Sequence, residues 1–118
     1  MTISLKHLIA TSLLVSAPTF AATCEMPEAP ELPDGNEATM DEMISGQQAF
    51  KGFQSDAQAY RDCVDETMGE MKAAAEEGEE TAVAKYAAAV EAYNGSVAAE
   101  EKLAAEFNAA IRAYKAAN

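Results

Sequence analysis

Two cysteines, Cys24 and Cys63, are the side chains of this chain with the most evident chemistry. They do not form a Cys-x-x-Cys motif, so their spacing does not fit a zinc ribbon or a redox dithiol. In a small exported protein, two cysteines are expected to pair with each other. The bond would close a loop of about 40 residues and stabilise the fold by about 4 kcal/mol on the chain-entropy estimate. We therefore predict a structural Cys24–Cys63 disulfide.

Groups suited to catalysis are scarce. The only histidine, His7, lies in an N-terminal segment that we expect to be removed, which leaves no imidazole for general base work near neutral pH. Ser45, Ser55 and Ser96 therefore lack the base of a Ser-His-Asp arrangement. The chain has no glycine-rich phosphate loop. We predict that the protein is not an enzyme and that it uses no cofactor.

Two methionine pairs and one acidic run are the candidate metal ligands. Met40 with Met43, and Met68 with Met71, place two thioethers on one helix face, and soft thioethers suit Cu(I). The acidic run 76–80, EEGEE, could gather Ca²⁺ through oxygen, although it lacks the alternating ligand spacing of a calcium loop. Core packing and a solvated turn explain the same residues without a metal. We expect no resident metal ion and keep metal handling as an alternative function.

Residues 1–21 have the pattern of a secretory signal peptide. Lys6 gives a positive start, an apolar stretch runs from Leu8 to Val15, and Thr19-Phe20-Ala21 suits cleavage. The apolar stretch is far shorter than the roughly 20 residues of a membrane span. We predict cleavage near Ala21 and export to the periplasm without a stable membrane anchor.

Cys24 lies close enough to this segment to allow a second interpretation, a lipoprotein signal with a lipidated cysteine. Such signals have Gly, Ala or Ser before the cysteine, and this chain has Thr23. Lipidation would also leave Cys63 without its expected partner. We therefore favour the disulfide over the lipid.

The mature chain would have about 97 residues, and this length predicts one small domain. The domain would carry a large negative charge. Without Lys6 it has seven basic residues against 20 acidic ones, a net charge of −13. Such a surface repels nucleic acid and anionic lipid and favours solubility. The expected partner is therefore a protein, which the sequence does not identify.

Residues 22–38 are predicted to form an extended, proline-rich arm. Pro27, Pro30 and Pro33 recur at every third residue, which suits a polyproline II helix. Asp34-Gly35 indicates the turn that ends it.

The length of this arm allows the disulfide to form. Fifteen residues of polyproline II cover about 46 Å, whereas a helix advances about 36 Å between Thr39 and Cys63. The arm can therefore run antiparallel along the helix and reach Cys63. In this arrangement we expect Met26 and Leu32 to face the helix.

Residues 39–77 are predicted to form a long amphipathic helix. Thr39 and Glu42 have the spacing of a capping box, and Gly78 is a suitable C-terminal stop. The larger side chains recur at steps of three or four residues, which is a helical pattern. They are Met43, Gln47, Phe50, Phe53, Ala57, Tyr60, Val64, Met68 and Met71.

Residues 79–117 are predicted to form a second helix of nearly equal length, about 55 Å. Its larger side chains alternate steps of three and four and form a heptad seam. The seam consists of Val83, Tyr86, Val90, Tyr93, Val97, Glu100, Ala104, Phe107, Ile111 and Tyr114. Because the seam keeps its phase through Asn94 and Gly95, we expect one continuous helix with Gly95 on its outer face.

The predicted fold is all-α: a two-helix antiparallel, coiled-coil-like hairpin with a proline-rich N-terminal arm pinned by a disulfide. Folding about Gly78 sets Met71 near Tyr86, Val64 near Val90, Ala57 near Val97, and Phe50 near Ala104 and Phe107. Two polar residues, Gln54 and Glu100, fall close together and are expected to fix the register.

The predicted disulfide holds the arm at Cys24 beside Cys63 of the first helix. The arm therefore cannot cover Met68 and Met71, which lie beyond Cys63. Exposed apolar patches mark contact sites, which makes these two methionines candidate interaction residues together with Gln54 and Glu100. The negative charge opposes association, and salt screens it. We expect a monomer at low salt and a weak homodimer, through the hairpin end near Gly78, as salt rises.

The motifs of the mature chain resemble a group of small, uncharacterised exported proteobacterial proteins. The resemblance is carried by Cys24-x-x-Pro27-x-x-Pro30-x-x-Pro33-Asp34-Gly35, Ala38-Thr39, Met43, Cys63, Tyr93-Asn94-x-x-Val97, Phe107-Asn108 and Arg112-Ala113-Tyr114. It implies export and a helical, disulfide-pinned form, and it supplies no activity or catalytic residue. The favoured function is a non-enzymatic periplasmic interaction or binding module with an unidentified partner. The alternative is a periplasmic metal-handling protein that uses the methionine pairs or the acidic run.

Overall fold

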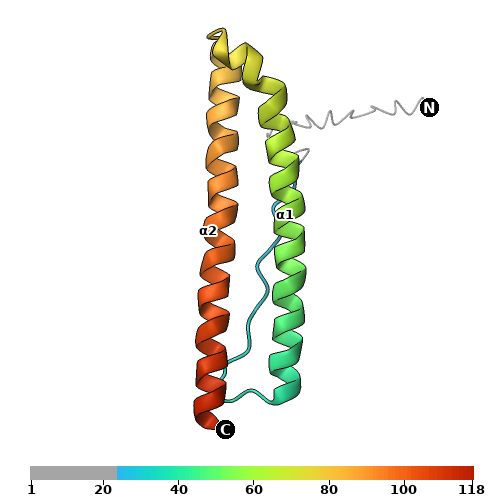
Figure 1. Ribbon diagram of the computed structural model, residues 1–118, viewed down its shortest axis with the longest axis vertical. Helices are drawn as coiled ribbons and strands as arrows, with labels where there is room; N and C mark the ends of the chain where they lie inside the picture. Colours follow the sequence, from blue (N-terminus) through green and yellow to red (C-terminus); the bar gives the residue numbers. More distant parts are fainter. Residues whose placement is uncertain (1–23) are drawn as a thin grey trace, which may run out of the picture.

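The protein is an antiparallel pair of long helices with an extended arm laid along it (Figure 1). The computed structural model describes residues 24–118, so the predicted signal peptide and its cleavage near Ala21 lie outside the described residues. Helix α1 spans Met40–Glu76 and helix α2 spans Glu80–Ala117. This confirms the predicted all-α hairpin, with helix ends within one residue of those expected. Neither described helix combines the length and the apolar character that crossing a membrane requires.

Local hydrogen bonds fix both ends of α1. The Thr39 hydroxyl accepts from the Glu42 N–H at 3.2 Å, and the Glu42 carboxylate accepts from the Thr39 N–H at 2.6 Å, which completes the predicted capping box. At the other end, Gly78 has a φ of +84°, a conformation that favours glycine. The N–H groups of Gly78 and Glu79 donate to the carbonyls of Ala75 and Ala74, as in a Schellman motif. The helix therefore stops where the sequence predicts.

The core between the helices confirms the predicted register. The rings of Phe50 and Phe107 stack with centroids 5.8 Å apart. Val64 and Ala89 belong to one buried cluster. A second cluster consists of Phe53, Ala57 and Leu103, with Leu32 of the arm packed against it. Helix α2 also runs unbroken through Asn94 and Gly95, with Gly95 exposed, as expected.

The rotation of α2 differs from the prediction. One line of the predicted seam, from Tyr86 to Tyr114 at seven-residue steps, does face the hairpin interior. The other buried line is not the valine line that starts at Val83, which is 46% exposed. It lies one residue earlier and consists of Ala82, Ala89, Ser96 and Leu103. Small side chains face α1 along much of this line because the bulky Tyr60, Phe53 and Arg61 of α1 need the space.

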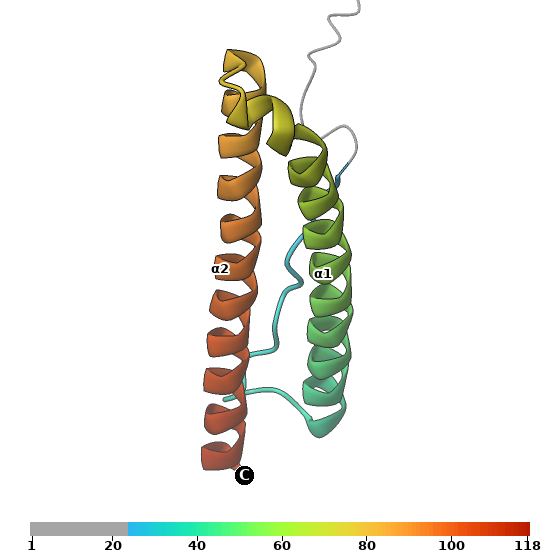
Figure 2. The ribbon, with the colours of Figure 1, turned by 45° about the horizontal axis from the view of Figure 1, so that its top comes forward.

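The arm contacts both helices (Figures 1 and 2). The predicted disulfide joins Cys24 to Cys63, with the two Cα atoms 5.7 Å apart. A sulfur atom held in a disulfide cannot also carry a lipid, so this bond excludes a lipidated Cys24 in the same molecule. Farther along, a Cβ on Gly35 would lie 1.9 Å from the carbonyl oxygen of Ala110, so only glycine fits against α2 there.

One expectation for the arm is wrong. Leu32 packs into the core as predicted, but Met26 is 38% exposed. Near Cys24 the arm lies on the flank of α1, where Met26 and Tyr60 line an open groove. The arm closes on both helices only near its other end, where Pro33 lies against Gly46 of α1.

Candidate functional site

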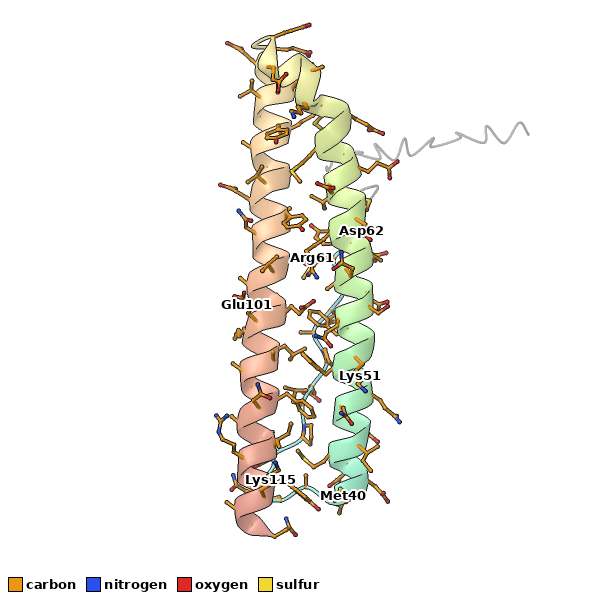
Figure 3. All side chains as sticks on the ribbon, in the orientation of Figure 1. Met40, Lys51, Arg61, Asp62, Glu101 and Lys115 are labelled. Atoms are coloured by element: carbon orange, nitrogen blue, oxygen red, sulfur yellow. A yellow bond between two sulfur atoms is a disulfide. The ribbon has the colours of Figure 1, made fainter. Side chains whose placement is uncertain are left out.

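A buried arginine is the principal polar group inside the hairpin. Helix α1 directs Arg61 toward α2 (Figure 3), and the residue is only 7% exposed. Its guanidinium donates to the Ser96 hydroxyl at 3.3 Å, to the Glu100 carboxylate at 3.1 Å and to the Gln58 side-chain oxygen at 3.2 Å. In residues 24–118, no buried side-chain nitrogen or oxygen lacks a hydrogen-bond partner. The cluster is thus internally satisfied, which suits a structural role better than catalysis.

This cluster adds a residue to the polar pair expected from the sequence. Gln54 and Glu100 were expected to lie close together and fix the register, and the ionic partner of Glu100 is Arg61. Arg61 lies seven residues after Gln54 on the same line of α1, and its longer side chain reaches Glu100. The sequence did contain a signal for this contact, because the predicted register places the basic residue Arg61 opposite Glu100. The prediction missed it because it followed only apolar and uncharged side chains along α1.

The two candidate methionine pairs lie at opposite ends of α1 and do not form a joint site. Met68 is half-buried and packs against the Val64–Ala89 cluster, and Met71 is half-buried as well. Met40 is 57% exposed and Met43 is buried. The two pairs are 28 positions apart on α1, which is about 42 Å along the helix. In the described part of the chain, no group of three or more His, Cys, Asp or Glu side chains is arranged to hold a metal ion.

One face of the hairpin is not covered by the arm, and we call it the arm-free face. On each helix its centre is a line of residues at seven-residue steps. These lines are Ile44, Lys51, Gln58, Asp65 and Lys72 on α1, and Val83, Val90, Val97, Ala104 and Ile111 on α2. Grooves that include arm residues are lined by the opposite flank of α1, which contains Ala49, Asp56 and Cys63.

Two grooves lie on the arm-free face, one at each end of the hairpin. The first, of about 360 Å³, is at the open end, where Figure 3 places Met40 and Lys115. It is mostly apolar and is lined by Met40, Met43, Ile44, Gln47, Phe107, Ile111, Tyr114 and Lys115. The second, of about 380 Å³, is near the turn and is lined by Lys72, Ala75, Glu76, Val83, Tyr86 and Ala87. Within residues 24–118, three of the four large exposed hydrophobic residues, Met40, Ile44 and Val83, therefore lie on this face.

The charge of the arm-free face differs from that of the rest of the protein. It carries three exposed basic side chains, Lys51, Lys72 and Lys115, and four exposed acidic ones, Asp62, Asp65, Glu76 and Glu101. Arg61 and Glu100 pair with each other in the interior. The face is therefore nearly neutral, and most of the net charge of −13 is carried by the arm and the other faces.

The arm-free face thus combines exposed apolar groups with a smaller excess of acidic side chains than the rest of the described surface. Of the Met68–Met71 patch expected from the sequence, both residues are half-buried, and Met68 packs against the Val64–Ala89 cluster. No family model, curated protein or solved structure matches this chain. Its functional assignment therefore rests on its own residues and geometry.

Proposed function

We propose that this protein is a non-enzymatic interaction module of the periplasm and that the arm-free face is its binding surface. The observation that carries the proposal is a nearly neutral, partly apolar face on a molecule of net charge −13. Scattered exposed hydrophobic residues need no explanation, but here three lie on one face beside two grooves.

The location is supported by the disulfide. A disulfide between Cys24 and Cys63 indicates a non-reducing environment. The signal-peptide pattern of residues 1–21 adds the route, which is export to the periplasm. Fractionation of the native cells checks both, because the protein should appear in the periplasmic fraction with an N-terminus near residue 22. Retention of the full-length chain in the cytoplasm would contradict this location.

The non-enzymatic assignment is supported by the state of the polar groups. The mature chain has no histidine. Ser96 is buried and its hydroxyl accepts from Arg61, so it is not available as a nucleophile. The remaining carboxylates lie mostly on exposed faces, where no enclosed cleft can desolvate them.

In-cell photocrosslinking tests the binding surface. A benzophenone amino acid replaces Ile44 or Val83, which are exposed on the arm-free face. Matched controls replace Ser55 and Ala98, which are exposed on the outer faces of the same helices. Illumination should give adducts from the first pair and none from the second. An absence of adducts from Ile44 and Val83 would refute the proposed function.

The alternative function, metal handling, has one observation in its favour. Met40 and Met43 line the same groove, so two thioethers could meet one Cu(I) ion there. Calorimetry with Cu(I) and Ca²⁺ separates the two functions. Binding tighter than about 1 μM, which corresponds to about 8 kcal/mol, would place metal handling first. A Met43→Leu variant, which keeps the volume and removes the thioether, identifies the site.

A further inference from the structure

We propose that a second copy of this chain occupies the arm-free face, and that the two copies pack antiparallel about a two-fold axis near Gln58 and Val97. The product is a symmetric four-helix bundle with both arms on the outside. This inference rests on the proposed function, because it names the partner of the same surface.

Charge selects this face for self-association. Two copies of net charge −13 repel each other through any of the acidic faces, which carry the arm and the acidic turn. The arm-free face is nearly neutral, so two copies can approach through it with the least electrostatic cost. The acidic side chains of both copies then point away from the contact into solvent.

The available area suits a stable dimer. Two helices of about 55 Å, each with a diameter of about 10 Å, present a face of about 1,000 Å². Stable interfaces of standard size bury about 800 Å² per partner. A dimer that covers most of the arm-free face therefore meets this requirement without any contribution from the arm.

The sequence of α2 is symmetric about Val97. At seven-residue steps, Val97 lies midway between Val90 and Ala104, and midway between Val83 and Ile111. A two-fold axis through Val97 therefore sets apolar residues against apolar residues along the whole line. The exposed Val83 of each copy meets Ile111 at the open-end groove of the other copy.

The sequence of α1 fits the same axis. Gln58 and Val97 lie at the same height on the hairpin, between the Phe50–Phe107 contact and the Val64–Ala89 contact. Antiparallel packing about Gln58 sets Lys51 of each copy opposite Asp65 of the other, which gives two symmetry-related ion pairs. Within one chain these residues are 14 positions apart, about 21 Å along the helix, so they cannot pair with each other.

The ends of the hairpin favour the antiparallel orientation. A parallel dimer would bring together two acidic turns, with four glutamates each at positions 76, 77, 79 and 80. The antiparallel dimer instead sets each acidic turn beside the open end of the partner, which carries Arg112 and Lys115 as well as Asp41 and Glu42. The sequence predicted a different association, through the hairpin end near Gly78. That association would place the same glutamates in contact. It would also use Met68 and Met71, which are half-buried.

Charge exchange tests the geometry. Sedimentation velocity of the mature protein at 150 mM NaCl, from about 5 to 100 μM, should show a dimer whose fraction rises with concentration. Lys51→Glu and Asp65→Lys should each weaken association by about tenfold, because each breaks two pairs worth a fraction of a kcal/mol to about 1 kcal/mol. The double variant should recover wild-type association, because it rebuilds both pairs with the polarity reversed.

A change in net charge alone would not give weaker association in both single variants and recovery in the double variant. Asp65→Lys reduces the negative charge of the chain and would strengthen any dimer limited only by general repulsion. The double variant has the wild-type net charge. Strengthening by Asp65→Lys, or failure of the double variant to recover, would overturn the proposed axis.

Two further variants locate the contact. Val97→Asp should abolish the dimer, while Ala98→Asp, on the exposed outer face of the same helix, should leave it intact. Gln58→Cys should crosslink to its symmetry mate with a short bismaleimide, and Gln48→Cys, on the outer face of α1, should not. Circular dichroism and urea unfolding check that each variant keeps its fold.

The outcomes separate this inference from the proposed function. A monomer at every concentration overturns the dimer, as does a dimer that survives Val97→Asp. In-cell adducts from Ile44 or Val83 with twice the mass of the chain support both proposals. Adducts of any other mass support the proposed function and overturn the second copy as its partner.

Discussion

At the scale of single residues, Arg61 and Gly35 have the largest consequences for the fold. Arg61 is buried and links α1 to Ser96 and Glu100 of α2. Gly35 allows the backbone of the arm to touch the backbone of α2 at Ala110. Both contacts join segments far apart in the chain: Arg61 holds the two helices together, and Gly35 holds the arm against α2.

Removal of the Glu100 carboxylate should destabilise the hairpin. Glu100→Ala leaves the buried guanidinium of Arg61 without its ionic partner, at a cost of about 2 kcal/mol. Urea unfolding measures this loss. Glu106→Ala is the matched control, because it removes the same carboxylate from an exposed pair with Lys102 at 3.9 Å; it should change stability by less than about 0.5 kcal/mol. Equal effects of the two variants would show that Arg61 does not depend on Glu100.

Replacement of Gly35 should loosen the arm. In Gly35→Ala the new Cβ would fall 1.9 Å from the Ala110 carbonyl oxygen, so the arm must move away from α2. We expect a loss of about 2 kcal/mol or more, measured by urea unfolding. Gly52→Ala is the control, because a Cβ at Gly52 meets nothing within 4 Å; it should stabilise α1 by about 1 kcal/mol. A neutral Gly35→Ala would mean that the arm does not hold this position in solution.

At the scale of elements, the arm acts as a third packing unit of a thin fold. It places Leu32 in the core and Pro33 against Gly46, a helix glycine that is buried by this contact. The disulfide anchors its far end to α1. The helices alone would leave this side of their interface open.

Loss of the disulfide should lower stability while the helices persist. The bond separates residues 39 positions apart, and the chain-entropy estimate for such a loop is about 4 kcal/mol. The Cys24→Ser/Cys63→Ser variant should therefore unfold at lower urea with nearly unchanged helix content by circular dichroism. Thiol titration of the denatured, non-reduced wild type should find no free thiol. Two thiols per chain would refute the pinned arm.

At the scale of the whole molecule, charge is distributed unevenly around the hairpin. Fifteen of the 20 acidic residues lie away from the arm-free face and the interior pair, against three basic ones, Lys85, Lys102 and Arg112. Acidic faces keep the protein soluble and repel copies from wrong directions. The nearly neutral face is then the surface on which association depends on packing.

This charge should make stability depend on salt. At about 1 μM protein, where association is negligible, the urea midpoint should rise between 20 and 500 mM NaCl, because salt screens repulsion among the acidic side chains. A Glu79→Gln/Glu80→Gln variant should show a smaller rise, since it removes two charges from the turn. A midpoint that does not change with salt would show that repulsion is not a significant cost in the folded monomer.

The sequence by itself determined the elements and their pairing. Capping residues, Gly78 and the three-four spacing specify two helices and their ends, because these depend on local geometry. The number of cysteines and the length of the arm specify the disulfide. The hairpin turn then fixes the register, as the Phe50–Phe107 contact confirms.

Only the tertiary structure decided which faces meet. A seven-residue repeat sets the spacing of the lines on α2 but not the rotation of the helix, so Val83 and Ala82 were equivalent choices in the sequence. The rotation of α2 depends on the side chains and backbone that α1 and the arm place opposite it. These include the buried guanidinium of Arg61 and the backbone of the arm at Gly35. These are contacts between distant segments, which local patterns do not specify. They leave the valine line of α2 on the arm-free face, where the proposed binding surface lies.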